Sequence, residues 1–78
     1  MIDSHQIEEH MEVIGSDGKR IGRVDHVQEE EIELAMLDLT AGLKHHMIRL
    51  EWVDHVEDNT VCLNLTKDAT RARWRPKG

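Results

Sequence analysis

The chain has 78 residues, which is enough for one hydrophobic core, and a chain of this length buries only roughly two-thirds of its unfolded surface when it folds. It contains no Phe or Tyr and only two Trp, so aliphatic side chains must form the core, and its single cysteine, Cys62, excludes an intramolecular disulfide. The formal net charge of −6 is unevenly distributed: residues 67–78 carry a net charge of +4, which leaves −10 for residues 1–66. An acidic body repels the phosphate backbone of nucleic acids, so we do not expect nucleic-acid binding.

The N-terminal residues Met1 to His5 form neither a basic leader nor an apolar run. No stretch of the sequence approaches the ~20 apolar residues of a membrane span. From the sequence we therefore expect a cytoplasmic protein without a membrane segment.

Short apolar runs alternate with turn signals along the chain, which is typical of a small all-β domain. At its start, residues 5–10 predict one helical turn capped by Asp3 or Ser4. Residues 11–14 predict the first strand.

The Asp17-Gly18 pair predicts a tight hairpin turn with a positive φ at Gly18. The second strand follows at 20–27. Its apolar residues fall three apart instead of two: Ile21, Val24 and Val27. This broken alternation predicts a bulge or a close strand approach at Gly22.

Residues 31–36 alternate as a third strand. One face carries Ile32, Leu34 and Met36, and the other carries Glu31, Glu33 and Ala35. Residues 38–46 predict a loop that contains Gly42.

The apolar pattern resumes after this loop, with Ile48 and Leu50 facing inward. Asp58-Asn59 predicts a second tight turn, and 61–65 alternates as the last strand. Thr66 or Asp68 then caps a helix that ends at Pro76. The basic side chains near its C-terminus interact favourably with the helix dipole: Arg71, Arg73 and Arg75.

These elements predict a mainly β fold: a small, partly open antiparallel β-barrel of five to six short strands with a short C-terminal helix. We expect a single domain over 1–78, with the barrel at 11–65, the helix at 66–75 and a tail at 76–78. The predicted core consists of Val13, Ile21, Val24, Val27, Ile32, Leu34, Met36, Ile48, Leu50, Val53, Val56, Val61, Leu63 and Leu65.

One four-residue pattern occurs twice. Val24-Asp25-His26-Val27 recurs as Val53-Asp54-His55-Val56, each time followed by an acidic turn and an alternating strand. Two β-hairpins with similar exits would explain this repeat.

The spacing of these features resembles the PRC-barrel superfamily, named for the cytoplasmic domain of the photosynthetic reaction centre H subunit. The resemblance rests on the strand, Asp-Gly turn and Gly-containing strand from Val13 to Val27, on the stretch from Ile48 to Val56 and on the closing strand from Val61 to Leu65. Within the superfamily the sequence is most similar to a bacterial family of unknown function, number 2171, in which Gly42–His46 and Glu51-Trp52-Val53 have counterparts. The resemblance implies a partly opened barrel that serves as an adaptor for proteins or RNA–protein assemblies, and it implies no activity.

The sequence has six histidines, which invites a metal-binding interpretation. If the two strand ends meet at the barrel rim, His26 and His55 can join His45 or His46 in binding Zn, Ni or Cu. In an extended chain, the adjacent His45 and His46 point to opposite faces and do not share an ion. The acids near the same strand ends are further candidate ligands: Asp25, Asp54, Glu57 and Asp58. The alternative is that these histidines are strand-end residues bonded to nearby carbonyls, because no HxxxH or HExxH spacing is present.

Nucleophilic catalysis has no support in the sequence. Cys62 has no neighbouring base in its strand, and Ser4 and Ser16 lie in a predicted cap and turn. No phosphate-binding or dinucleotide-binding glycine loop is present. We therefore expect neither an enzyme nor a cofactor.

The favoured function is a protein-interaction module that self-associates as a homodimer, because a chain this poor in large apolar residues gains from added buried area. Trp52 and Trp74 are the expected anchors. The basic residues Arg71, Arg73 and Arg75 can contact the acidic body of a second copy. The alternative is that both tryptophans seal the protein's own barrel, and the alternative function is metal or ligand binding by the histidines.

Overall fold

The computed structural model describes residues 4–35 and 45–76. The strands are β1 (Glu12–Ile14), β2 (Arg20–Val27), β3 (Glu31–Leu34), β4 (His46–Arg49), β5 (Val53–Glu57), β6 (Thr60–Leu63) and β7 (Arg75–Pro76). The helical elements are two 3-10 turns, η1 (Ser4–Gln6) and η3 (Leu50–Trp52), and the helix α1 (Lys67–Arg73).

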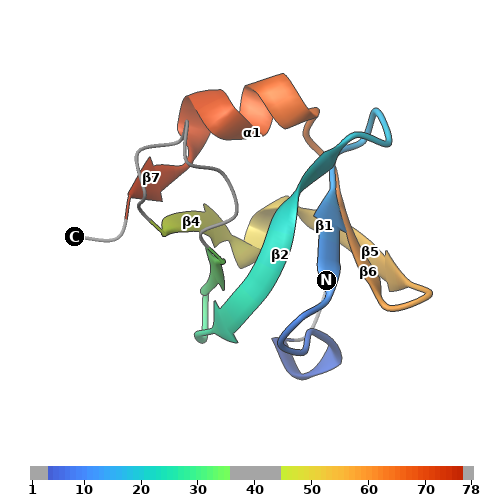
Figure 1. Ribbon diagram of the computed structural model, residues 1–78, viewed down its shortest axis with the longest axis vertical. Helices are drawn as coiled ribbons and strands as arrows, with labels where there is room; N and C mark the ends of the chain where they lie inside the picture. The colour runs from blue at the N-terminus through green and yellow to red at the C-terminus, as the bar shows by residue number, and fades with distance from the viewer. Residues whose placement is uncertain (1–3, 36–44, 77–78) are drawn as a thin grey trace.

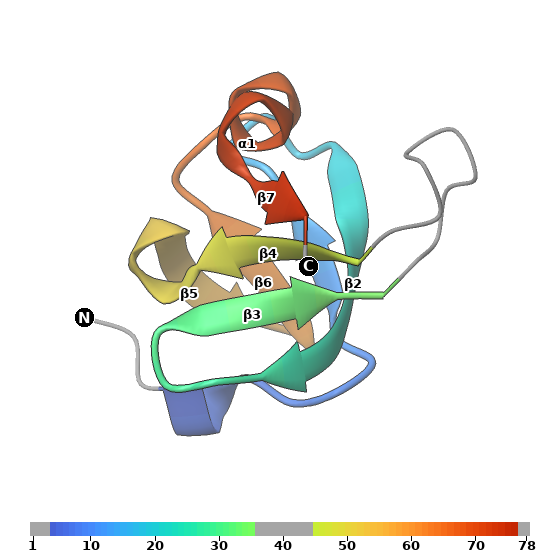
Figure 2. The same ribbon diagram turned by 90° about the vertical axis from the view of Figure 1, so that its left-hand side faces the viewer.

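The strands form one sheet in the order β5-β6-β1-β2-β3-β4-β7, and β5 and β7 are its open edges. The first half of β2 pairs with β1 and its second half pairs with β3, so the sheet turns along β2 and wraps around the core (Figures 1 and 2). Every strand pair is antiparallel except β1 and β6, which run parallel. The predicted mainly β, partly open fold with a C-terminal helix is confirmed. The described sheet has seven strands where five to six antiparallel strands were predicted, because Arg75–Pro76 adds β7, and one of its pairs is parallel.

The two predicted tight turns are present in the structure. Gly18 has φ 78, as predicted. Val13 pairs with Gly22 while Ile14 pairs with Arg20, so Ile21 is an extra residue and the predicted irregularity lies next to Gly22. The second predicted turn has φ 49 at Asp58 and φ 62 at Asn59, the two positive values of a type I′ hairpin.

The N-terminal turn differs from its prediction over 5–10. It is a single 3-10 turn at Ser4–Gln6. The chain then reaches His10, whose φ of 73 is incompatible with a continuing helix. Ile7 and Met11 flank this bend, and both are buried in the core.

Most of the predicted core is confirmed. The predicted residues that are buried are Val13, Val24, Ile32, Leu34, Ile48, Val53, Val61 and Leu63. Others are partly buried against that cluster: Ile21, Val27, Leu50 and Val56. Leu65 is half-buried, and Met36 and residues 38–44 of the predicted loop lie outside the described residues. His46, which was predicted in that loop, is the first residue of β4 because it pairs with Pro76. Leu50 is less buried because it belongs to η3 and not to a strand.

Five residues with buried side chains were not predicted in the core: Ile7, Met11, Met47, Glu33 and Thr70. Met47 and Glu33 are cross-strand neighbours in the β3–β4 pair, on the face opposite Ile32 and Ile48. Both faces of this hairpin are therefore sheltered from water at that point.

The C-terminal helix is shorter than its predicted span of 66–75. Thr66 caps it, because its side chain accepts a hydrogen bond from the amide of Ala69 at 3.1 Å. The helix ends at Arg73, and Arg75 is extended, as expected for a residue before proline. Arg75 and Pro76 form β7 beside β4 and do not begin a tail.

The β1–β2 turn packs against the start of α1. A side chain at Gly15 would lie 2.7 Å from the amide nitrogen of Lys67 and 3.0 Å from the carbonyl oxygen of Leu65, so only glycine fits. The amide of Ser16 donates to the same Leu65 carbonyl at 2.8 Å. This contact fixes α1 across one end of the sheet.

Candidate functional site

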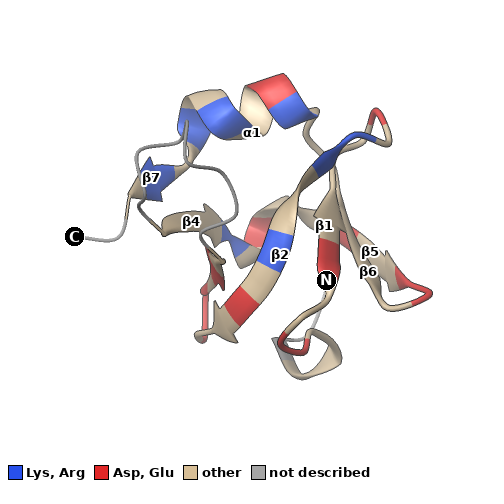
Figure 3. Cartoon of the chain, in the orientation of Figure 1, with Lys and Arg blue, Asp and Glu red and all other residues tan. Residues whose placement is uncertain are grey.

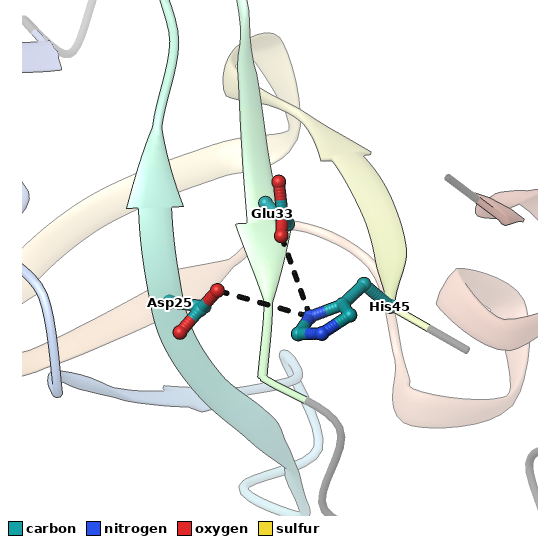
Figure 4. A group of neighbouring side chains, drawn as sticks. All are labelled: Asp25, Glu33 and His45. Carbon is teal, nitrogen blue, oxygen red and sulfur yellow. Dashed lines mark ion pairs between the residues drawn. The ribbon is translucent and has the colours of Figure 1, made fainter. Parts of the chain in front are cut away.

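A second irregularity in β2 builds the candidate site. Val24 pairs with Leu34 and His26 pairs with Glu33, so Asp25 is an extra residue in the strand. A bulge of this kind redirects the side chain of the extra residue. Asp25 and Glu33, on adjacent strands, and His45, just before β4, come together here (Figure 4).

One imidazole nitrogen is the centre of this cluster. His45 Nδ1 lies 3.4 Å from Glu33 Oε2 and 3.8 Å from Asp25 Oδ2. It also lies 3.0 Å from the carbonyl oxygen of Leu34. One candidate ligand atom from each of the three side chains lies within 4.8 Å of the other two.

The three side chains differ in their contact with water. The side chain of Glu33 is 6% exposed, whereas those of His45 and Asp25 are 35% and 46% exposed. A buried carboxylate is costly unless a cation or hydrogen bonds compensate its charge. A metal ion bound by the three side chains would be such a cation.

The predicted histidines do not gather at one rim. His26 lies on β2 and His55 on β5, and β6 and β1 separate these strands in the sheet. His45 joins the acidic cluster, whereas the ring of His46 stacks on Trp74 at 4.1 Å between centroids. The two adjacent histidines therefore serve different contacts.

The repeated Val-Asp-His-Val pattern has a structural counterpart. In β5, Val53 pairs with Leu63 and His55 pairs with Cys62, so Asp54 is an extra residue as Asp25 is in β2. Both copies occur in the first strand of an antiparallel hairpin, as the repeat predicted.

The β5 copy makes a different set of contacts. Asp54 Oδ2 lies 2.7 Å from His55 Nδ1, and Glu57 Oε2 lies 3.4 Å from the other ring nitrogen. The hydrogen bond to Asp54 raises the pKa of His55, with smaller support from Glu57. Because the two carboxylates approach opposite nitrogens, these three side chains do not converge on one ion.

Cys62 faces the same acidic neighbourhood. Partial burial raises the pKa of its thiol, and the charges of Glu57 and Asp54 raise it further. A thiol of this kind stays protonated at neutral pH and is a poor nucleophile.

The predicted interface residues make contacts within the chain. Trp52 and Trp74 are partly buried against the core. The guanidinium of Arg71 lies 5.6 Å from the Trp74 ring centroid, and Arg75 Nε donates to Glu31 Oε2 at 3.1 Å. Arg73 is exposed on α1.

Glu33 is the site residue that sequence reasoning did not single out. Its position in the alternation assigns it only to the face opposite the core. The available signal was its place between Ile32 and Leu34, and the structure adds that this strand pairs on both sides. An acid in such a strand is a candidate for burial.

A family model described as an uncharacterized protein conserved in bacteria (DUF2171) matches residues 7–71, which is most of the chain. The chain belongs to this family. The family description carries no activity, and no curated protein matches the sequence. None of the helices within 4–35 and 45–76 is long and apolar enough to cross a membrane. The wider likeness to PRC barrels stays a prediction.

Proposed function

We propose that this protein is a non-enzymatic interaction module that self-associates through opposite charges on two surfaces, the β5 edge of its sheet and the surface formed by α1 with the β7 edge. The observation that carries the proposal is the distribution of charge in Figure 3, where acidic residues follow β5 and its turn, and basic residues follow α1 and β7. The partner that binds each of these charged surfaces is a second copy of the chain.

The acidic edge consists of Asp54 and Glu57 on β5 and Asp58 in the following turn, all exposed. Acidic side chains on an open edge disfavour pairing with an identical edge, because like charges would face each other. His55 contacts Asp54 and Glu57 and offsets part of their charge, and the remaining negative charge favours a basic surface.

The basic edge consists of Arg71 and Arg73 on α1 and Arg75 on β7. Glu31 already neutralises part of the charge of Arg75, so Arg71 and Arg73 are the main contributors. Two copies lying side by side in opposite directions bring each acidic edge to a basic edge, which gives a two-fold homodimer.

Screening sets the conditions for the test. The Debye length is about 8 Å at physiological salt, so this association should weaken as salt increases. We expect the weight-average mass in sedimentation experiments to fall from about 20 mM to about 0.5 M NaCl.

Charge reversal identifies the edges. Arg73→Glu and Asp54→Lys should each abolish self-association, and an equimolar mixture of the two variants should restore it as a heterodimer. Lys19→Glu makes the same charge change as Arg73→Glu in the exposed β1–β2 turn and should leave association intact. A monomer at every salt concentration, or equal losses in the Lys19 and Arg73 variants, would contradict the proposal.

A further inference from the structure

We propose that Asp25, Glu33 and His45 form a binding site for one divalent transition-metal ion, with Zn²⁺ as the test ion. The site lies on adjacent strands in the β3 half of the sheet. It is independent of the charged edges that carry the proposed function.

The spacing of the donor atoms fits a shared ion. Nitrogen and oxygen ligands lie about 2.0–2.2 Å from zinc, so two ligands of one ion are separated by roughly 3–4 Å. His45 Nδ1 is 3.4 Å from Glu33 Oε2 and 3.8 Å from Asp25 Oδ2. Only small side-chain movements are needed for all three atoms to reach one ion.

The fold holds two of the ligands on strands. The bulge in β2 turns Asp25 toward the cluster, and Glu33 is held in a strand that pairs on both sides. Ligands on paired strands are held more firmly than ligands on loops. The Leu34 carbonyl accepts a hydrogen bond from His45 Nδ1 at 3.0 Å, so Nδ1 must release this proton when it binds the ion.

The charge of the three side chains and their ligand atoms favour a divalent transition-metal ion. Two carboxylates and a neutral imidazole carry a charge of about −2, which a divalent cation neutralises, including the charge on buried Glu33. An imidazole ligand favours Zn, Ni, Cu or Fe over Mg and Ca, which prefer oxygen ligands. Because Asp25 is partly exposed, the ion is accessible from solvent, and water can complete its coordination.

The repeated pattern in β5 supplies an internal comparison. Asp54 occupies the same bulge position as Asp25, but the residues across from it are Leu63 and Cys62. His55 contacts its two carboxylates through opposite ring nitrogens. The geometry therefore assigns metal binding to the β2 copy and not to the β5 copy.

The test is titration of the tag-free full chain with ZnCl₂ by calorimetry, with MgCl₂ as the comparison salt. We expect one Zn²⁺ per chain and no heat from Mg²⁺. At about 100 times the dissociation constant, Zn²⁺ should raise the midpoint of thermal unfolding by roughly 10 °C or more. Co²⁺ should give a visible d–d absorption band that reports direct coordination.

Matched variants locate the ion. Asp25→Asn and His45→Gln should each weaken Zn²⁺ binding at least as much as the roughly tenfold to hundredfold cost of losing an outer-shell partner. Asp54→Asn and His55→Gln make the same changes in the β5 copy and should leave the affinity unchanged. Circular dichroism of each variant without metal checks the fold, and Asp25→Asn is the decisive variant because its side chain is partly exposed.

Three results would overturn the site. The first is no Zn²⁺ binding by the wild-type chain. The second is an equal loss of affinity in the β2 and β5 variants. The third is a Co²⁺ band that persists in the His45 variant. Repeating the titration with Arg73→Glu separates metal binding from self-association, because that variant should bind Zn²⁺ normally.

Discussion

Replacing Leu34 with alanine tests the core directly. Leu34 is 2% exposed and packs among the buried residues of both halves of the sheet. The substitution removes about three methylene equivalents at ~0.8 kcal/mol each and leaves a cavity, so we expect a loss of about 3 kcal/mol. A domain of 78 residues has an unfolding free energy of roughly 4–12 kcal/mol, so the variant loses a large share of its stability.

Leu50→Ala is the matched control, because it removes the same atoms from a half-buried position in η3. We expect it to cost about half as much as Leu34→Ala, or roughly 1.5 kcal/mol. Urea unfolding followed by tryptophan fluorescence measures both values. Equal losses, or a loss for Leu34→Ala below about 1 kcal/mol, would refute the assigned core.

Two further predictions concern a titration and a turn. The hydrogen bond that His55 donates to Asp54 raises the pKa of His55. The stability that this bond contributes is complete below the unfolded pKa of 6.5 and is lost as pH rises through the higher folded value. An NMR titration should show this raised pKa in the wild type and a value nearer 6.5 in Asp54→Asn; no change between them would contradict the assignment. Gly18→Ala should cost about 1 kcal/mol in urea unfolding, because φ is 78 and no atom lies within 4 Å of the added carbon, whereas Gly18→Asn should cost less. A neutral alanine variant would show that the turn relaxes.

Local sequence signals predicted the turns and most of the core. The residue types of Gly18 and the Asp58-Asn59 pair are enough to predict their positive φ values. The two-residue period of the strand places Ile32 and Leu34 on one face, whichever strands it pairs with. Thr66, a residue type common at helix N-caps, likewise predicts the start of α1. These features depend only on a few neighbouring residues, so they can be predicted without knowing the order of the strands in the sheet.

The candidate site could not be predicted in the same way, because it depends on pairings between distant residues. Asp25 meets Glu33 only because of a bulge whose position is set by the register between β2 and β3. His26 and His55 look equivalent in the sequence, but the strand order places two other strands between them. The histidine that joins the site, His45, was one of four candidates that local reasoning could not rank.

The parallel pairing of β1 with β6 bears on the order in which the chain folds. The β2–β3 and β5–β6 hairpins join neighbouring segments and can form on the microsecond timescale. The contact between Val13 and Val61 closes a loop of nearly fifty residues, at an entropic cost of roughly 3 kcal/mol. We therefore expect the two hairpins to form first and β1 to pair with β6 in a later step. Until that step the inner edges of both hairpins are open, and it is then that the chain is most exposed to pairing with another molecule.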